Sequence, residues 1–185
     1  MNRMTQIKNA VPRPETLLQI RRPRALDGAA VWRLINASGT LDANSLYCNL
    51  LQCSHFAATC AVAELDGEIV GWMSGYVPPE TPNALFVWQI CVADAARGRG
   101  LARRLVAEVL ARPQTTALQY VECTITPTNQ PSWALFRSIA RALDTGLHTQ
   151  PHFLRGAHLD GQHDSEIRVM IGPFANSPAA LAKAA

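Results

Sequence analysis

The chain has 185 residues, of which 48% are hydrophobic and 17% charged, and its formal net charge is +3. This composition is typical of a single globular domain with a sizeable core, and it excludes an extensively disordered chain. The small net charge argues against a nucleic-acid-binding protein. The sequence contains no run of about twenty apolar residues, so it predicts no membrane-spanning helix.

Hydrophobic spacing predicts alternating strands and helices between a flexible leader at 1–14 and a flexible tail at 173–185. The single domain, 15–172, is expected to begin with a strand at 17–21, a helix around Trp32, a helix that Asn44 is able to cap, and a hairpin of strands 59–65 and 68–77 around Asp66-Gly67. It is expected to continue with a buried strand at 86–92, a helix at 100–111, a strand at 120–126, a helix around Trp133 and two strands between 148 and 171. Hairpins followed by strand–helix units predict an α/β or mixed α+β fold.

The cysteines and the N-terminal residues favour a cytoplasmic protein. The five cysteines form no CxxC pair, which favours free thiols in a reducing compartment over a disulfide framework. Roughly the first thirty residues lack the apolar stretch of a signal peptide. The spacing of the late histidines His152, His158 and His163 matches no standard metal site, so no metal is expected.

The most informative segment is the turn Arg97-Gly98-Arg99-Gly100-Leu101-Ala102, between the buried strand and the following helix. A helix start exposes unpaired backbone N–H groups and carries about half a positive charge. Glycines allow a ligand to approach that backbone closely. The turn therefore predicts a pyrophosphate site with Arg97 and Arg99 as phosphate partners, and the alternative is a solvated basic turn.

The pattern Arg97-x-x-Gly100-x-Ala102 resembles the acetyl-CoA signature of the GNAT superfamily of N-acetyltransferases. A strand of the form Trp-Gln-Ile-Cys-Val precedes it, and Asn129-Gln-Pro-Ser132-x-x-Leu135-Phe136 follows a later strand. The resemblance implies a twisted mixed sheet of roughly six to seven strands flanked by about four helices, whose fourth and fifth strands splay apart around the pantetheine arm. The implied acetyl-CoA contacts are Ile90, Cys91, Val92, Arg97, Gly98, Arg99, Gly100, Leu101, Ala102, Asn129 and Phe136.

Four further segments are similar to the diaminobutyrate acetyltransferase family, whose product is consumed in ectoine synthesis. They are Leu41-Asp42-x-Asn44-Ser45-x-Tyr47, Phe86-Val87-Trp88-Gln89, Glu122-x-Thr124-Ile125-Thr126-Pro127 and His163-Asp164. The resemblance implies acetylation of the N4 amine of L-2,4-diaminobutyrate by direct attack in a ternary complex. It implies substrate contacts at Asp42, Tyr47, Trp88, Glu122 and His163. Relatives with this fold commonly pair, so we expect a weakly held homodimer.

The chemistry of acyl transfer supports a role for Glu122. An alkyl amine with a pKa near 10 is neutral in only about one molecule in a thousand at pH 7, and a carboxylate both attracts the cation and accepts its proton. Strand alternation places Glu122 with Thr124 on the face opposite Val121, Cys123 and Ile125. We expect a partly desolvated carboxylate that faces the substrate, and the alternative is a surface glutamate.

The other candidates have competing structural interpretations. Asp42 suits ordinary turn chemistry, and Tyr47 is also a candidate core residue. Trp88 shares its expected strand face with Phe86 and Ile90, so it either packs in the core or attracts the substrate ammonium by a cation–π interaction. His163 rests on the resemblance alone.

Two expectations concern the reacting groups. The backbone N–H of Val92, where the strands part, is able to stabilise the developing oxyanion. Phe136 occupies a position where many GNAT enzymes carry a proton-donating tyrosine, so the proton donor is left open between Tyr47, a water and no donor at all.

The sequence is also compatible with two alternative functions. One keeps the enzyme and changes the acceptor to another small amine, a polyamine or an N-terminal peptide. The other is a non-catalytic acyl-CoA-binding module, which would keep the glycine turn yet need no acceptor carboxylates.

Overall fold

The computed structural model describes residues 17–39, 41–42, 44–175 and 181, and one mixed sheet of seven strands organises them. The strands, in chain order, are β1 (Leu18–Arg21), β2 (Ala61–Leu65), β3 (Glu68–Tyr76), β4 (Ala84–Val92), β5 (Tyr120–Ile125), β6 (Leu147–Phe153) and β7 (Glu166–Ile171). Their spatial order is β1-β2-β3-β4-β5-β7-β6. All neighbouring pairs are antiparallel except β4 and β5, which run parallel.

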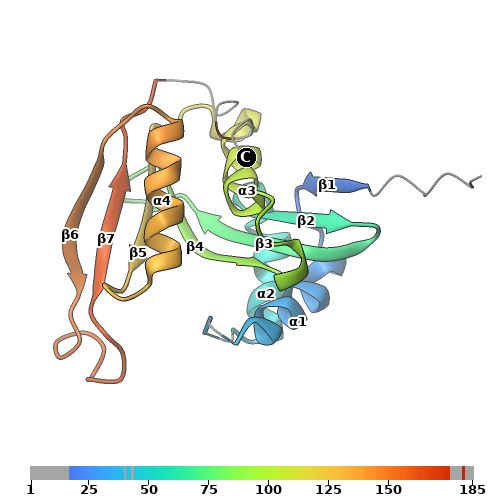
Figure 1. The fold of residues 1–185 in the computed structure, drawn as a ribbon, viewed down its shortest axis with the longest axis horizontal. Coiled ribbons are helices and arrows are strands. Elements are labelled where there is room, and N and C mark those ends of the chain that lie inside the picture. The colour runs from blue at the N-terminus through green and yellow to red at the C-terminus, as the bar shows by residue number, and fades with distance from the viewer. Residues whose placement is uncertain (1–16, 40, 43, 176–180, 182–185) are drawn as a thin grey trace, which may run out of the picture.

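Helices cover both faces of the sheet (Figure 1). The α-helices are α1 (Gly28–Ser38), α2 (Leu46–Ser54), α3 (Leu101–Leu110) and α4 (Gln130–Ala142). One core cluster joins α3 and α4 to the sheet through residues such as Leu85, Leu105 and Ile139. A second cluster, which includes Val31, Trp72 and Cys91, joins α1 and α2 to the other face. The expected mixed fold, with its strand and helix numbers, is confirmed.

The predicted elements form, with small differences at their ends, and the buried strand expected at 86–92 begins at Ala84. Asp66 and Gly67 both have positive φ, 51° and 88°, as the tight turn of the predicted hairpin requires. The strand expected from residue 59 begins at Ala61, because residues 57–59 form a short 3-10 helix. The cap of α2 is Ser45 rather than Asn44, since the Ser45 hydroxyl accepts the N–H of Cys48.

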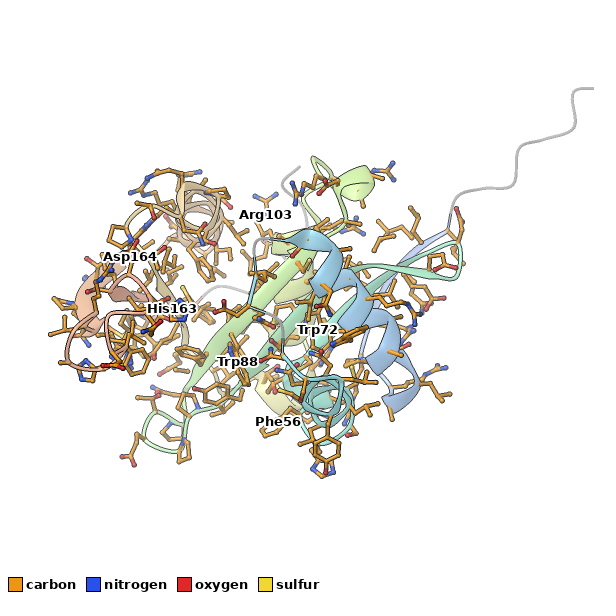
Figure 2. The ribbon with its side chains drawn as sticks, turned by 90° about the horizontal axis from the view of Figure 1, so that it is seen from below. Phe56, Trp72, Trp88, Arg103, His163 and Asp164 are labelled. Carbon is orange, nitrogen blue, oxygen red and sulfur yellow. The ribbon has the colours of Figure 1, made fainter. Side chains whose placement is uncertain are left out.

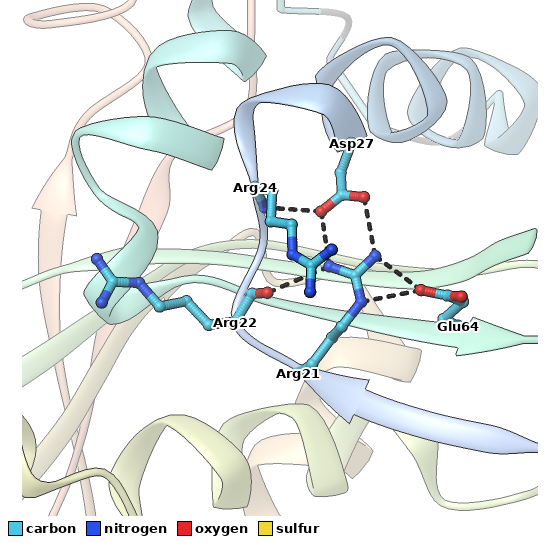
Figure 3. A network of polar contacts seen from close by, with 5 residues as sticks. All are labelled: Arg21, Arg22, Arg24, Asp27 and Glu64. Carbon is cyan, nitrogen blue, oxygen red and sulfur yellow. Dashed lines mark hydrogen bonds and ion pairs between the residues drawn. The ribbon is translucent and has the colours of Figure 1, made fainter. Parts of the chain in front are cut away.

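An ion-pair network fixes the start of α1 on the sheet (Figure 3). The Arg21 guanidinium on β1 contacts Asp27, which directly precedes α1, at 2.7 Å and Glu64 on β2 at 2.7 Å. Although burial raises the pKa of Asp27, its hydrogen bonds to Arg21 and to the Arg24 backbone lower it by more. The network therefore stabilises the fold at neutral pH, and this contribution is lost as pH falls through the lowered pKa of Asp27.

All five cysteines lie in the described part of the chain, and all are free thiols, as the sequence predicts. Four are buried, and burial raises the pKa of Cys53 to about 12 and that of Cys60 to about 11. Across the described ranges, no helix is both long and apolar enough to cross a membrane.

The segment expected to be a flexible tail contributes to the core. Phe174 and Leu181 are both buried in the cluster beneath α3 and α4. Most of the leader and tail, including all of residues 1–14, lies outside the described residues.

Leu181→Ala tests this packing. We expect it to lower the free energy of unfolding by about 2–5 kcal/mol, because it removes a fully buried side chain. Urea unfolding measures the change. Leu26→Ala is the matched control, since Leu26 is 93% exposed and its truncation should have little effect. Equal unfolding midpoints for the two variants would contradict the packing of Leu181.

Candidate active site

The two parallel strands separate in the middle of the sheet. β4 and β5 pair only from Ala84 to Phe86, opposite Tyr120 to Glu122. β4 then runs on to Val92 and β5 to Ile125, which leaves a V-shaped opening between them. The expected splay is therefore present. It begins at Phe86 and Glu122, however, and not at Val92 as the sequence suggested.

The edge of β4 offers free backbone groups to this opening. The N–H of Ala93 donates to the Val70 carbonyl at 2.8 Å, on the β3 side. Because peptide groups alternate in direction along a strand, Ile90 and Val92 direct theirs towards the opening. Cys91 instead pairs with β3 and buries its side chain in the α1 cluster. The backbone groups available at the opening are therefore those of Ile90 and the N–H of Val92, whose carbonyl accepts from Arg97 Nε at 3.4 Å.

A bulge in β4 changes the expected side-chain faces. Ser74 pairs with Gln89 and Gly75 with Val87, so Trp88 is the extra residue on β4. A bulge re-aims side chains locally. Trp88 consequently stays on the face of α1 and α2, whereas Ile90 packs against the α3 and α4 cluster. The expectation that Trp88 and Ile90 share a face is wrong, because strict alternation does not continue through a bulge.

Trp88 forms one wall of a pocket of about 430 Å³. The lining residues come mainly from α2, β3, β4 and β5 and are Gln52, Phe56, Ser74, Gly75, Tyr76, Phe86, Trp88, Thr124 and Phe153. The labels of Trp88 and Phe56 lie close together in Figure 2, and both residues line this pocket. Trp88 is 50% exposed, so it is a pocket wall and not a core residue. The aromatic faces suit a cationic ligand.

Gln89 ties the loop before α2 to β4. Its side-chain Nε2 donates to the Asp42 carbonyl at 2.9 Å, and its Oε1 accepts from Asn44 at 2.9 Å. These two hydrogen bonds hold the loop that carries Asp42 close to Gln89 and so near its neighbour Trp88. The side chain of Asp42 is exposed. Tyr47 is 69% exposed in the first turn of α2, which excludes the core role considered for it. Gln89 was not among the predicted site residues, and its only sequence signal is a polar residue in an apolar strand.

Glu122 is a buried carboxylate paired with an arginine. Its side chain is 3% exposed and lies on the same strand face as Thr124, which lines the pocket. Arg168 on β7 donates to Glu122 Oε2 from Nη2 at 2.6 Å and from Nε at 3.1 Å. The alternative of a surface glutamate is excluded by this burial. Arg168 was missed from the sequence because the two residues lie 46 positions apart.

The glycine turn has the backbone expected of an anion site. Gly98 and Gly100 have φ of 77° and 65°, and Gly100 is the N-cap of α3 and provides no side-chain hydrogen bond to it. The Nε of Arg103, in the first turn of α3, is buried and has no partner among the described groups. Arg97 pairs with Asp94 at 2.8 Å, while Arg99 is exposed. Uncapped N–H groups and an unpartnered guanidinium fit a pyrophosphate at Gly98–Ala102.

Three predicted residues lie outside this arrangement or have structural roles. Asn129 caps α4 by accepting the N–H of Ser132, and Phe136 is buried in the core. His163 is exposed on the β6–β7 loop, at the end of the molecule opposite α1 (Figure 2). Among the residues that the structure places, no cluster of His, Cys, Asp and Glu is suited to a metal ion.

Gly98→Ala tests the glycine turn. Nothing lies within 4 Å of an added Cβ, so the cost comes from the left-handed backbone, about 1–2 kcal/mol. We expect the turn to change conformation to relieve this strain and affinity for CoA to fall roughly 5- to 30-fold, as measured by calorimetry. Gly67→Ala is the control, because Gly67 has φ +88° and equally open space in a distant hairpin. Equal CoA affinity in both variants would exclude the turn as the binding site.

Comparisons with known proteins agree with this geometry. Residues 30–140 match the Acetyltransferase (GNAT) family. The L-2,4-diaminobutyric acid acetyltransferase of Methylotuvimicrobium alcaliphilum is 45% identical over 167 residues, which cover 90% of this chain and 95% of that protein. Its namesake from Chromohalobacter salexigens is 46% identical over 158 residues, which cover 85% of this chain and 82% of that protein.

A solved structure is similar over nearly the same range. Diaminobutyrate acetyltransferase EctA from Paenibacillus lautus, in complex with L-2,4-diaminobutyric acid and coenzyme A, has a TM-score of 0.82 and 36% identity. The match covers 87% of this chain and 98% of that one. The parted strands, the glycine turn and these similarities together establish that the chain belongs to the GNAT family of acetyltransferases.

Proposed function

We propose that the protein transfers the acetyl group of acetyl-CoA to the N4 amine of L-2,4-diaminobutyrate, a step in ectoine synthesis. The observation that carries the proposal is the buried carboxylate of Glu122, on the pocket face where β4 and β5 part. The relatives named above, which cover most of this chain, support the same acceptor. Direct attack in a ternary complex requires both substrates at this opening.

Each part of the opening has a proposed role toward the thioester. The Gly98–Ala102 turn holds the pyrophosphate, and the backbones of Ile90 and Val92 hold the pantetheine arm. Acetyl-CoA supplies the acetyl group as a thioester, whose oxygen accepts the N–H of Val92 as negative charge develops on it. Phe136 has no proton to donate, but a thiol with a pKa near 8.5 leaves without a strong acid.

The acceptor amine must lose its proton before it attacks. Glu122 Oε2 holds Arg168, and no donor among the described residues contacts Oε1, which is therefore available to the substrate ammonium. Glu122 accepts the ammonium proton, the amine nitrogen bonds to the carbonyl carbon, and the carbon–sulfur bond then breaks. The attacking nitrogen gives up its second proton to the departing sulfur or to water, so CoA leaves as the thiol or thiolate and the N4-acetyl amide remains.

Four further residues are proposed to contact the acceptor. Asp42 attracts the second ammonium group, and Trp88 offers an aromatic face to a cation. Tyr47, exposed just after the loop tied by Gln89, is proposed to contact the substrate or to supply a proton to the leaving group. His163 is also proposed to contact the acceptor, and this assignment rests on the sequence resemblance alone.

The cellular setting is also a proposal. The five free cysteines suit the reducing cytoplasm. The proposed assembly is a weakly held homodimer, because proteins with this fold commonly form dimers. Sedimentation at several protein concentrations tests this assembly.

The acceptor is tested by CoA release with a panel of amines. We expect rapid release with L-2,4-diaminobutyrate and little with L-ornithine or L-lysine, because the longer chains displace the reacting amine from Glu122. Release with other amines but not with L-2,4-diaminobutyrate would support the broader amine acetyltransferase. CoA binding with no release in any reaction would support a non-catalytic module.

Glu122→Gln separates catalysis from binding. We expect turnover to fall by about 10²- to 10⁴-fold, because the amide cannot accept the ammonium proton. Affinity for CoA should stay unchanged, since Glu122 is assigned to the acceptor. Glu68→Gln, at an exposed position on β3, is the control for the loss of one carboxylate. If Glu122→Gln lowered turnover and CoA affinity equally, Glu122 would be a structural residue.

A further inference from the structure

Arg168 uses only part of its guanidinium on Glu122. Nε and Nη2 both donate to the same oxygen, Oε2. The third nitrogen, Nη1, makes no hydrogen bond to any described residue and is not among the buried unpartnered atoms. With the side chain 26% exposed, one donor edge of a positively charged group remains open.

The strand register places Arg168 beside the pocket wall. Arg168 on β7 lies directly opposite Thr124 on β5, and Thr124 lines the pocket. Residues directly opposite on paired strands share a face of the sheet. As far as the described residues define it, the pocket lining contains no cationic side chain, so Arg168 is the guanidinium adjacent to that wall.

The opening has charged groups of both signs nearby, which suits an acceptor that carries both ammonium and carboxylate groups. Asp42 and Glu122 are carboxylates, and Arg168 is a cation beside one of them. L-2,4-Diaminobutyrate carries two ammonium groups and one carboxylate at neutral pH. A simple diamine of the same length carries the ammonium groups alone and leaves the open edge of Arg168 without a partner.

We propose that Arg168 binds the α-carboxylate of the acceptor through Nη1 while Nε and Nη2 hold Glu122. The inference rests on the proposed function and adds the residue by which an amino acid is selected over a plain diamine. A planar guanidinium serves both partners at once, because its donors point along separate edges. The same contact fixes the acceptor relative to the carboxylate that takes its proton.

A purely structural Arg168 would act through Glu122 alone. Loss of the arginine would then disturb the buried carboxylate and impair every acceptor to the same extent. A carboxylate-binding Arg168 predicts an additional loss, confined to acceptors that carry the α-carboxylate. The ratio of kcat/KM for two matched acceptors separates these roles, because any common effect through Glu122 cancels in the ratio.

The experiment compares L-2,4-diaminobutyrate with 1,3-diaminopropane, the same diamine without the carboxylate, in the full-length enzyme. In Arg168→Gln we expect the preference for the amino acid to fall roughly 10- to 150-fold, mainly through a higher KM for L-2,4-diaminobutyrate. Arg168→Lys keeps a cation beside the buried Glu122 and so protects the fold, yet a single ammonium cannot bind two carboxylates in the fork geometry. The preference should fall in this variant as well.

Arg33→Gln is the control for the loss of one arginine, since Arg33 is exposed on α1. An unchanged preference in either soluble Arg168 variant would overturn the inference and leave the proposed function intact. Failure of the wild-type enzyme to acetylate L-2,4-diaminobutyrate would overturn both.

Discussion

The candidate site depends on the early end of the hydrogen-bonded ladder between β4 and β5. Three paired positions hold these parallel strands together, after which each continues without the other. The separation leaves one backbone edge of β4 free, and a free edge in the middle of a sheet is costly unless a ligand or solvent satisfies it. It also places Glu122 at the last paired position, where a polar side chain is buried beside an opening.

The parallel direction of the pair has a second effect. Because β4 and β5 run the same way, the helices that follow them, α3 and α4, both begin near the open end of the V. Their starts differ chemically. Asn129 caps α4 with its side chain, whereas Gly100, the N-cap of α3, has no side chain to do so. The uncapped start is the one with N–H groups to offer an anion.

Local sequence signals predicted the elements and much of the candidate site. Periodicity identified the strands and helices, the Asp-Gly pair identified the hairpin, and alternation placed Glu122 on the pocket face. The glycine spacing identified the turn before α3. These signals succeed because each reports a requirement within a few residues of the chain.

What the sequence did not reveal depends on contacts between distant segments. The bulge at Trp88 comes from the way β4 pairs with β3, and no period-2 pattern in β4 alone records it. The partnership of Gln89 with Asp42 and Asn44 joins residues about 45 positions apart, as does that of Glu122 with Arg168. The burial of Phe174 and Leu181 could not be predicted either, because the Pro- and Ala-rich composition of this segment does not show that two of its apolar side chains reach the core.

The burial of Phe136 limits which acyl donors suit this enzyme. With a hydrocarbon ring packed at position 136 of α4, this position supplies no hydroxyl to neutralise a departing anion. A sulfur anion is a weak enough base to depart unaided. An oxygen ester would release a far more basic alkoxide, which the ring of Phe136 gives no help to neutralise, so the packing of this aromatic side chain favours thioester donors.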